Sequence, residues 1–346
     1  MIVNCQGLEL SEGLLRVSKA ISNKIANPIL EGIKIIAEDD TLTMSATDTE
    51  LTIEKKIKAE VKQEGETVVP GRFITEFVKK LTNTTIQMEL NEKNQLIIKY
   101  DDSESIIQCY NPVEYPGFKN IETKEYFGIS QKDFKTVVNK SIFSVATDDS
   151  RPILKGVLFD IKDDELNVVA LDGYRLARVK KQVKSSIKKS IVVPSRSLNE
   201  LSKMIEESED IINVYVGEYT IMVDLGDTKV TSRLLERDYI NYKQIIPINF
   251  ETFVIANKEQ LEQALERATL LLRVSNNNFV KFDIKENNLC ITSNSELGNL
   301  KENIPVTVSG KDLVISFNPR YFLESLRVNT NEFVKLCFNS SSTPCV

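Results

Sequence analysis

The side chains that most often carry chemistry are scarce or scattered in this sequence. It contains no histidine, which removes the commonest general base, the commonest transition-metal ligand and every Ser-His or Cys-His pairing. The five cysteines form no CxxC pair, so their spacing predicts neither a zinc site nor a redox dithiol. They are Cys5, Cys109, Cys290, Cys337 and Cys345, and buried thiols are the expectation for them. Most hydrolase chemistry is therefore disfavoured.

Asp148 and Asp149, followed by Arg151, could be imagined as a metal-binding or acid/base pair. Adjacent acids in a loop are typical of a solvated turn, so we interpret them in that way. Neither a GxxxxGK[ST] loop nor a GxGxxG motif occurs, so no phosphate cradle for a nucleotide is predicted. We predict no catalytic residue, no metal and no cofactor.

The totals describe a globular protein of two or three domains. Its 346 residues are 41% hydrophobic and 27% charged, and no apolar run is long enough to cross a bilayer. The N-terminal stretch MIVNCQGLELSEG lacks the basic start and apolar core of a secretory signal, so we expect a soluble, cytoplasmic protein. The net charge of −6 is a sum that can hide a separation of positive and negative surfaces.

Three stretches of the chain repeat one another. PIL-x-G begins at Pro28 and again 124 residues later at Pro152, and VVP occurs with the same offset at Val68 and Val192. A third copy reads SFNPRYFLESLRV, and its Pro319 lies 125 residues beyond the proline of the second VVP. A period this long indicates three similar domains rather than a solenoid.

Each repeat is predicted to be α+β, with two helices packed on antiparallel sheet. Apolar residues at helical spacing follow Ser11, Ser130 and Asn257, which are expected to cap the first helix of each repeat. A second helix follows each repeated proline, and short alternating runs between the helices predict strands. The expected domains are residues 1–124, 125–249 and 250–346, called here the first, second and third repeats. The third lacks about one strand, which we interpret as a partial sequence.

Basic residues gather on the predicted helices of every repeat, whereas acidic residues gather in strands and turns. One interpretation is a surface that contacts phosphates without reading bases; the other is that these charges only solvate the helix faces. Glu259, Glu262 and Glu266 would dilute the positive charge in the third repeat. The basic residues are Arg16, Lys19, Lys24, Arg72, Lys79, Lys80, Lys132, Lys135, Lys140, Arg196, Lys203, Lys258, Arg267, Arg320 and Arg327.

The stretch SRPILKGVLFDIKDDELNVVALDGYRLARV (150–179) resembles the middle domain of the bacterial DNA polymerase III beta subunit family, the sliding clamps. The resemblance extends along the chain through NPILEGIKI, SATDTEL, VVPGRF, YPGF, IVVPSRS, YKQIIP and SFNPRYFLESL. It implies a DNA clamp fold in which a head-to-tail homodimer closes six domains into a ring around duplex DNA. It also implies a processivity factor for the replicative polymerase that has no catalysis of its own.

The resemblance further implies which residues carry these contacts. Partner proteins, including the polymerase and clamp-loader subunits, would dock short peptides in a pocket formed by Leu154, Leu171, Gly173, Tyr174, Arg175, Leu176, Ile240, Gln244, Ile245, Asn318, Tyr321, Thr343 and Cys345. Sequence-independent contacts to double-stranded DNA would come from Lys24, Arg72, Asp148, Arg151 and Arg196. The dimer interface would use Ile106, Leu270 and Leu271. Leu171 and Tyr174 depart from the threonine and histidine frequent in the family.

Two other functions remain open on the sequence. One is a scaffold that binds only peptides, whose behaviour would not depend on salt. The other is an enzyme that uses cysteine or carboxylate chemistry, which the absence of histidine disfavours.

Overall fold

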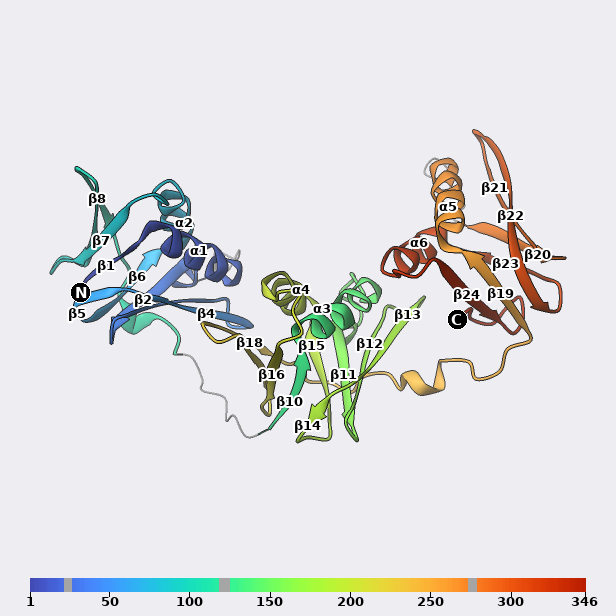
Figure 1. The fold of residues 1–346 in the computed structure, drawn as a ribbon, viewed down its shortest axis with the longest axis horizontal. Helices are drawn as coiled ribbons and strands as arrows, with labels where there is room; N and C mark the ends of the chain where they lie inside the picture. The colour runs from blue at the N-terminus through green and yellow to red at the C-terminus, as the bar shows by residue number, and fades with distance from the viewer. Residues whose placement is uncertain (22–26, 118–124, 273–278) are drawn as a thin grey trace. The chain divides into compact units, whose positions relative to one another are not determined.

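The computed structural model describes residues 1–21, 27–117, 125–272 and 279–346, and Figure 1 shows the chain as a ribbon. These residues form two compact units. The N-terminal unit comprises Met1–Val138, Val145–Val168 and Val179–Arg237. The C-terminal unit comprises Asn139–Ser144, Val169–Arg178 and Asp238–Val346.

Each repeat begins with a strand, which our prediction of an initial helix missed. In the first repeat, two helices and nine strands alternate along the described chain. They are β1 (Ile2–Gln6), α1 (Gly7–Val17), β2 (Gly32–Glu38), β3 (Thr41–Thr47), β4 (Leu51–Lys58), β5 (Glu60–Gln63), β6 (Gly65–Pro70), α2 (Gly71–Val78), β7 (Thr85–Leu90), β8 (Gln95–Tyr100) and β9 (Ser103–Gln108).

The second repeat follows the same order, with short 3₁₀ turns before β11 and after β18. Its elements are β10 (Tyr126–Ser130), α3 (Gln131–Asn139), β11 (Gly156–Lys162), β12 (Glu165–Leu171), β13 (Leu176–Gln182), β14 (Lys184–Ser185), β15 (Lys189–Pro194), α4 (Ser195–Met204), β16 (Ile211–Val216), β17 (Thr220–Asp224) and β18 (Thr228–Arg233).

The third repeat contains β19 (Thr252–Asn257), α5 (Lys258–Leu272), β20 (Val280–Lys285), β21 (Asn288–Ser295), β22 (Gly298–Gly310), β23 (Leu313–Phe317), α6 (Pro319–Arg327) and β24 (Phe333–Phe338). Three strands follow α2 and three follow α4, but one follows α6 in the described chain, so the difference is two strands where we expected one. Val346 exchanges two backbone hydrogen bonds with Cys337 of β24.

The helix starts agree with two of the three predicted caps. The Ser130 hydroxyl accepts a hydrogen bond from the backbone of Asp133, and Asn257 accepts one from Gln260. Ser11 is wrong as a cap, because α1 already begins at Gly7 and buries Ser11 inside the helix. The strand β1 runs directly into α1, so the helix needs no separate cap loop. The repeated prolines stand at the starts of α2, α4 and α6 as predicted.

Within the N-terminal unit one sheet runs through both repeats. Its strand order is β14-β10-β16-β17-β18-β4-β3-β2-β6, and the joint is the antiparallel pair of β4 with β18 (Figure 1). Lys55 of β4 is buried at this joint and forms an ion pair with Asp227, just before β18. A second sheet has the order β5-β1-β7-β8-β9, and β9 is its edge strand. The strands β13-β12-β11-β15 form a third sheet, in which the end of β12 and the start of β13 belong to the C-terminal unit.

The C-terminal unit is built on a six-stranded sheet of order β23-β20-β21-β22-β19-β24. Helix α5 packs on this sheet and α6 packs beside α5. The apolar stripe predicted for α5 is buried in the core, together with Leu323 and Leu326 of α6. Phe282, Phe317 and Phe322 contact one another there. This packing fixes the orientation of α6, which carries part of the candidate site.

Candidate partner-binding site

A tight turn at residues 172–175 joins β12 to β13. The Asp172 carboxylate accepts hydrogen bonds from the backbone of Tyr174 (2.9 Å) and Arg175 (3.0 Å), which is an Asx-type turn. Gly173 has φ +97°, a conformation that glycine adopts without steric penalty. The turn is therefore fixed by Asp172, which our sequence interpretation did not select.

The Arg175 guanidinium is enclosed by groups from three segments of the C-terminal unit. Nε donates to Asp172 at 3.0 Å, Nη2 donates to the backbone oxygen of Phe143 at 2.6 Å, and Nη1 pairs with Glu324 of α6. The guanidinium carbon lies 5.4 Å from the ring centre of Phe143 and 4.7 Å from that of Tyr321, within cation–π range. Only 14% of the side chain is exposed.

Helix α6 presents Tyr321 and Glu324 to this turn. Asn318 caps the helix by accepting a hydrogen bond from the backbone of Arg320. Glu324 binds Arg320 one helical turn earlier at 2.8 Å as well as Arg175. Burial raises the pKa of Glu324, but the hydrogen bonds from Arg320 and Arg175 outweigh it, so the pKa lies below the ordinary value of 4.5. The carboxylate is thus ionised near neutral pH.

Tyr174 is the exposed member of the cluster. Its ring stacks on Tyr321 with centroids 6.0 Å apart and an interplanar angle of 26°, and 82% of the residue is open to solvent. An exposed tyrosine ring that stacks on a half-buried one, beside a partly buried polar network, is a suitable surface for an apolar side chain of a partner.

The remaining predicted pocket residues are divided between the units. Leu171 is buried at the end of β12, and Leu176 is half-buried at the start of β13. Ile240 is half-buried, whereas Gln244 and Ile245 are exposed near the short 3₁₀ turn Tyr242–Gln244. Leu154 is buried in the N-terminal unit.

The chain end supplies the last two predicted pocket residues. The Thr343 hydroxyl accepts a hydrogen bond from the backbone of Ser340 at 2.9 Å. Burial raises the pKa of the Cys345 thiol to about 12, so this cysteine is not a ready nucleophile.

Phe143 and Glu324 are further members of the cluster that sequence interpretation missed. The spacing of Arg320 and Glu324, four residues apart on a helix, is a signal for an ion pair. Asp172 before Gly173 is a turn signal. Nothing in the sequence around Phe143 indicates that its carbonyl accepts from an arginine.

The predicted DNA-contacting residues occupy different settings. Lys24 lies outside the described residues. Arg72, at the start of α2, and Arg151 are exposed. Asp148 accepts hydrogen bonds from the backbone and hydroxyl of Ser150, and these lower its pKa, which fits the interpretation as a solvated turn. Arg196, at the start of α4, is 50% exposed and pairs with Asp48.

The helix cations differ between the first and third repeats. In the third repeat all four are paired with carboxylates: Lys258 with Glu262, Arg267 with Glu302, Arg320 with Glu324, and Arg327 with Glu266. In the first repeat Arg16, Lys19, Lys79 and Lys80 form no ion pair within the described part of the chain. The positive charge available to a polyanion is therefore greater on the first repeat.

Two of the three predicted interface residues are exposed. Ile106 is 56% exposed on the edge strand β9, and Leu270 is 58% exposed near the end of α5. Leu271 is half-buried. In β22, residues 298–305 pair with β21, and residues 306–310 pair with β19. Among the described strands, one side of residues 298–305 is therefore unpaired.

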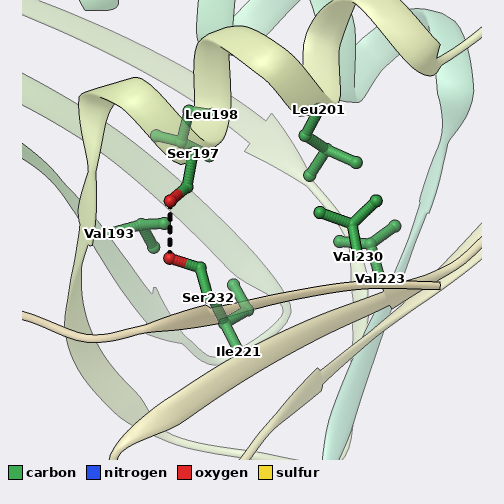
Figure 2. Close-up of a pocket in the computed structure, with 8 residues that line it drawn as sticks. All are labelled: Val193, Ser197, Leu198, Leu201, Ile221, Val223, Val230 and Ser232. Atoms are coloured by element: carbon green, nitrogen blue, oxygen red, sulfur yellow. Dashed lines mark hydrogen bonds between the residues drawn. The ribbon is translucent and has the colours of Figure 1, made fainter. Parts of the chain in front are cut away.

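The pocket in Figure 2 is a packing defect in the N-terminal unit. It lies between α4 and the strands β17 and β18, and Ser197 and Ser232 share a 2.7 Å hydrogen bond at its edge. A volume of about 10 Å³ holds one water molecule at most. Elsewhere in the described residues no group of three metal-ligating side chains is present. No described helix is long and apolar enough to cross a membrane.

Three family models together match nearly the whole chain. The DNA polymerase III beta subunit N-terminal, central and C-terminal domains match residues 1–120, 128–241 and 243–346. The beta sliding clamp of Bacillus subtilis is 32% identical over 97% of this chain and 92% of its own. That of Staphylococcus epidermidis is 31% identical over 95% and 90%.

Solved structures agree with these matches. The sliding clamp from Bacillus subtilis superposes with a TM-score of 0.97 at 31% identity, covering 100% of this chain and 94% of that one. A putative DNA polymerase III beta subunit from Eubacterium rectale gives 0.96 at 30% identity, with 100% and 95% covered. The chain belongs to the family of the DNA polymerase III beta subunit, the beta sliding clamp, and is a non-catalytic processivity subunit of that polymerase.

Proposed function

We propose that two copies of this chain close head to tail into a ring around duplex DNA, and that partner proteins dock through short peptides at the turn 172–175. The repeats would act as domains 1–124, 125–249 and 250–346, and the protein would work in the cytoplasm. The observation that supports closure is the β4–β18 pair, in which an edge strand of one repeat extends the sheet of the next.

The same pairing is available between copies. Strand β9 occupies in the first repeat the position that β18 occupies in the second, 125 residues later, and it is a sheet edge. In the third repeat β22 follows the hairpin β20–β21, as β4 follows the hairpin β2–β3 in the first repeat. Residues 298–305 of β22 pair with β21 on one side, and among the described strands their other side is unpaired. We propose that β9 of one copy, which contains Ile106, pairs with this side of β22 in the other, and that Leu270 and Leu271 of α5 lie at the same contact. Head-to-tail contacts close when the rotation adds to a full turn.

The ring needs only weak contacts with DNA. Topology retains the duplex, so exposed lysines and arginines can neutralise phosphates without fixing register. Arg72 and Arg151 are the proposed contacts whose exposure suits this role. Arg196, which is half exposed and paired with Asp48, is a further proposed contact.

Retention on DNA of different topology tests encirclement. After loading by the clamp loader, the protein should remain on nicked circular duplex during gel filtration and should leave the same duplex once it is linearised. Equal retention on both forms would contradict a topological link. Sedimentation of Ile106→Asp should show monomers where the unsubstituted protein sediments as a dimer.

Substitutions at the turn test the docking proposal. Arg175→Ala and Leu176→Ala should weaken binding of a peptide from the same organism's replicative polymerase, measured by calorimetry, while sedimentation still shows dimers. Unchanged affinity would remove these residues from the site.

A scaffold that binds only peptides is the alternative, and the paired cations of α5 and α6 favour it. It predicts no association with DNA at any salt concentration, whereas DNA contacts of a clamp should weaken steeply as salt rises.

A further inference from the structure

We infer that Arg175 and Glu324 are a positioning pair that holds Tyr174 and Tyr321 as a fixed aromatic surface, and that Arg175 does not itself bind the partner peptide. This inference rests on the proposed peptide docking and assigns separate roles within that site.

Most hydrogen-bond donors of Arg175 are already engaged within the protein. A guanidinium offers five N–H groups in a fixed plane. Asp172, Glu324 and the backbone oxygen of Phe143 bind all three of its nitrogens. The rings of Phe143 and Tyr321 lie against it. Two N–H groups therefore remain, but only 14% of the side chain is exposed, so a peptide has little access to them.

Glu324 connects the turn 172–175 to helix α6. It stands on α6 three residues after Tyr321, and its two carboxylate oxygens bind Arg175 and Arg320. The arginine therefore ties three segments of the C-terminal unit together: the turn 172–175, the segment containing Phe143, and α6. Without the carboxylate, the half-buried guanidinium loses a charged partner and the turn loses its link to the helix.

The exposed group of this cluster is an aromatic ring and not the guanidinium. Tyr174 is open to solvent, and the ring beneath it belongs to Tyr321, which also lies against Arg175. Fixing the exposed ring of Tyr174 on the half-buried ring of Tyr321 before the ligand arrives reduces the entropy lost on binding. The surface fits an apolar peptide side chain and offers no unpaired positive charge to an acidic one.

The two roles of Arg175 predict opposite results for Glu324→Gln. If Arg175 positions the tyrosines, removing the carboxylate charge should loosen them and weaken peptide binding. If Arg175 contacts the peptide, the same substitution releases guanidinium donors and should leave binding unchanged or make it tighter.

A fluorescence measurement without ligand tests the positioning directly. The sequence contains no tryptophan, so Tyr174→Trp in the full chain gives a single reporter on the exposed ring. Adding Glu324→Gln should increase local motion, seen as faster depolarisation in time-resolved anisotropy, whereas the matched control Glu266→Gln, whose partner is Arg327, should not. Identical decays for all three proteins would overturn the inference.

A binding measurement tests the consequence. With a fluorescein-labelled peptide from the same organism's replicative polymerase, Glu324→Gln should raise the Kd about tenfold, and Glu266→Gln should leave it unchanged. Glu324→Gln combined with Arg175→Met should be no weaker than Arg175→Met alone, because both remove the same pair. Unchanged or tighter binding by Glu324→Gln would overturn the inference. Absence of binding by the unsubstituted protein would instead overturn the docking proposal, and the anisotropy result would still decide the positioning role.

Discussion

The turns at residues 48–51 and 172–175 lie at matching places in the first and second repeats and share one hydrogen-bond pattern. Asp48 accepts from the backbone of Glu50 and Leu51 at 3.0 and 2.8 Å, as Asp172 accepts from the two residues at the same offsets. In each turn the first residue's N–H also donates to the backbone oxygen of the fourth. The two repeats therefore share the same aspartate-stabilised turn.

The surroundings of the two turns differ. The second oxygen of Asp48 pairs with Arg196, which comes from α4 and is half exposed. The second oxygen of Asp172 pairs with Arg175 of its own turn, which passes the link on to α6 through Glu324. The aspartate of the first turn forms a single ion pair. The aspartate of the second turn belongs to a network that contacts Tyr174 and Tyr321. The same local fold thus serves an internal joint in one repeat and a candidate docking surface in the other.

Replacing the aspartates should give the largest difference between the turns. We expect Asp172→Ala to lower the free energy of unfolding by about 3 kcal/mol, because a half-buried guanidinium and two backbone donors lose their acceptor. Asp48→Ala should lower it by about 1–2 kcal/mol, because Arg196 can turn to water. Urea denaturation followed by circular dichroism measures both. Equal losses would mean that the Arg175 network adds no stability.

Lowering the pH should weaken the network around the turn 172–175, because that network contains the ionised Glu324. The folded pKa of Glu324 is lowered from 4.5, so its contribution is fully present above that value and disappears as the pH falls through the folded pKa. The charged groups bound to it are Arg175 and Arg320, and Arg175 also binds Asp172.

We therefore expect the tenfold difference in peptide Kd between the unsubstituted protein and Glu324→Gln to stay constant from pH 7 to 5 and to shrink below 4.5. Fluorescence titration of both proteins measures it. A difference that already shrinks between pH 7 and 5 would contradict the lowered pKa.

Substitutions at the second position of each turn, Thr49 and Gly173, should change stability less than loss of the aspartates. Thr49 has φ +78° where Gly173 has φ +97°, and a β-branched residue is strained in this region. Thr49→Gly should raise the midpoint of thermal unfolding, and Gly173→Ala should lower stability by about 1 kcal/mol, although a Cβ there would meet no atom within 4 Å. Stabilisation by Gly173→Ala would show that chain entropy outweighs strain.

Loss of the exposed ion pair between Arg196 and Asp48 should have the smallest effect on stability. Arg196→Gln removes the partner of Asp48 but keeps both backbone hydrogen bonds of that turn, so stability should change by about 0.5 kcal/mol or less. The matched change in the other network, Arg175→Gln, should be clearly larger in the same urea titration. A large effect at Arg196 would make the first turn as dependent on its arginine as the second.

Much of the fold could be predicted from the sequence. The proline-led helices, the apolar stripe of α5 and the caps at Ser130 and Asn257 follow from local patterns that hold wherever the segment lies. The strand before each first helix was missed because it runs into the helix without a turn signal, and the start of α1 was misplaced for the same reason. Arg175 and Tyr321 were selected by resemblance, whereas Phe143, Asp172 and Glu324 were not.

The sequence by itself determined the three repeats, their α+β character and the absence of histidine chemistry, because these depend on residue type and short-range spacing. Tertiary structure alone decided that Arg175 meets a carboxylate 149 positions away and that the helix cations of the third repeat are neutralised by acids. An ion pair depends on where two backbones bring their side chains, and this distance is set by packing of the core rather than by either residue's neighbours in the chain.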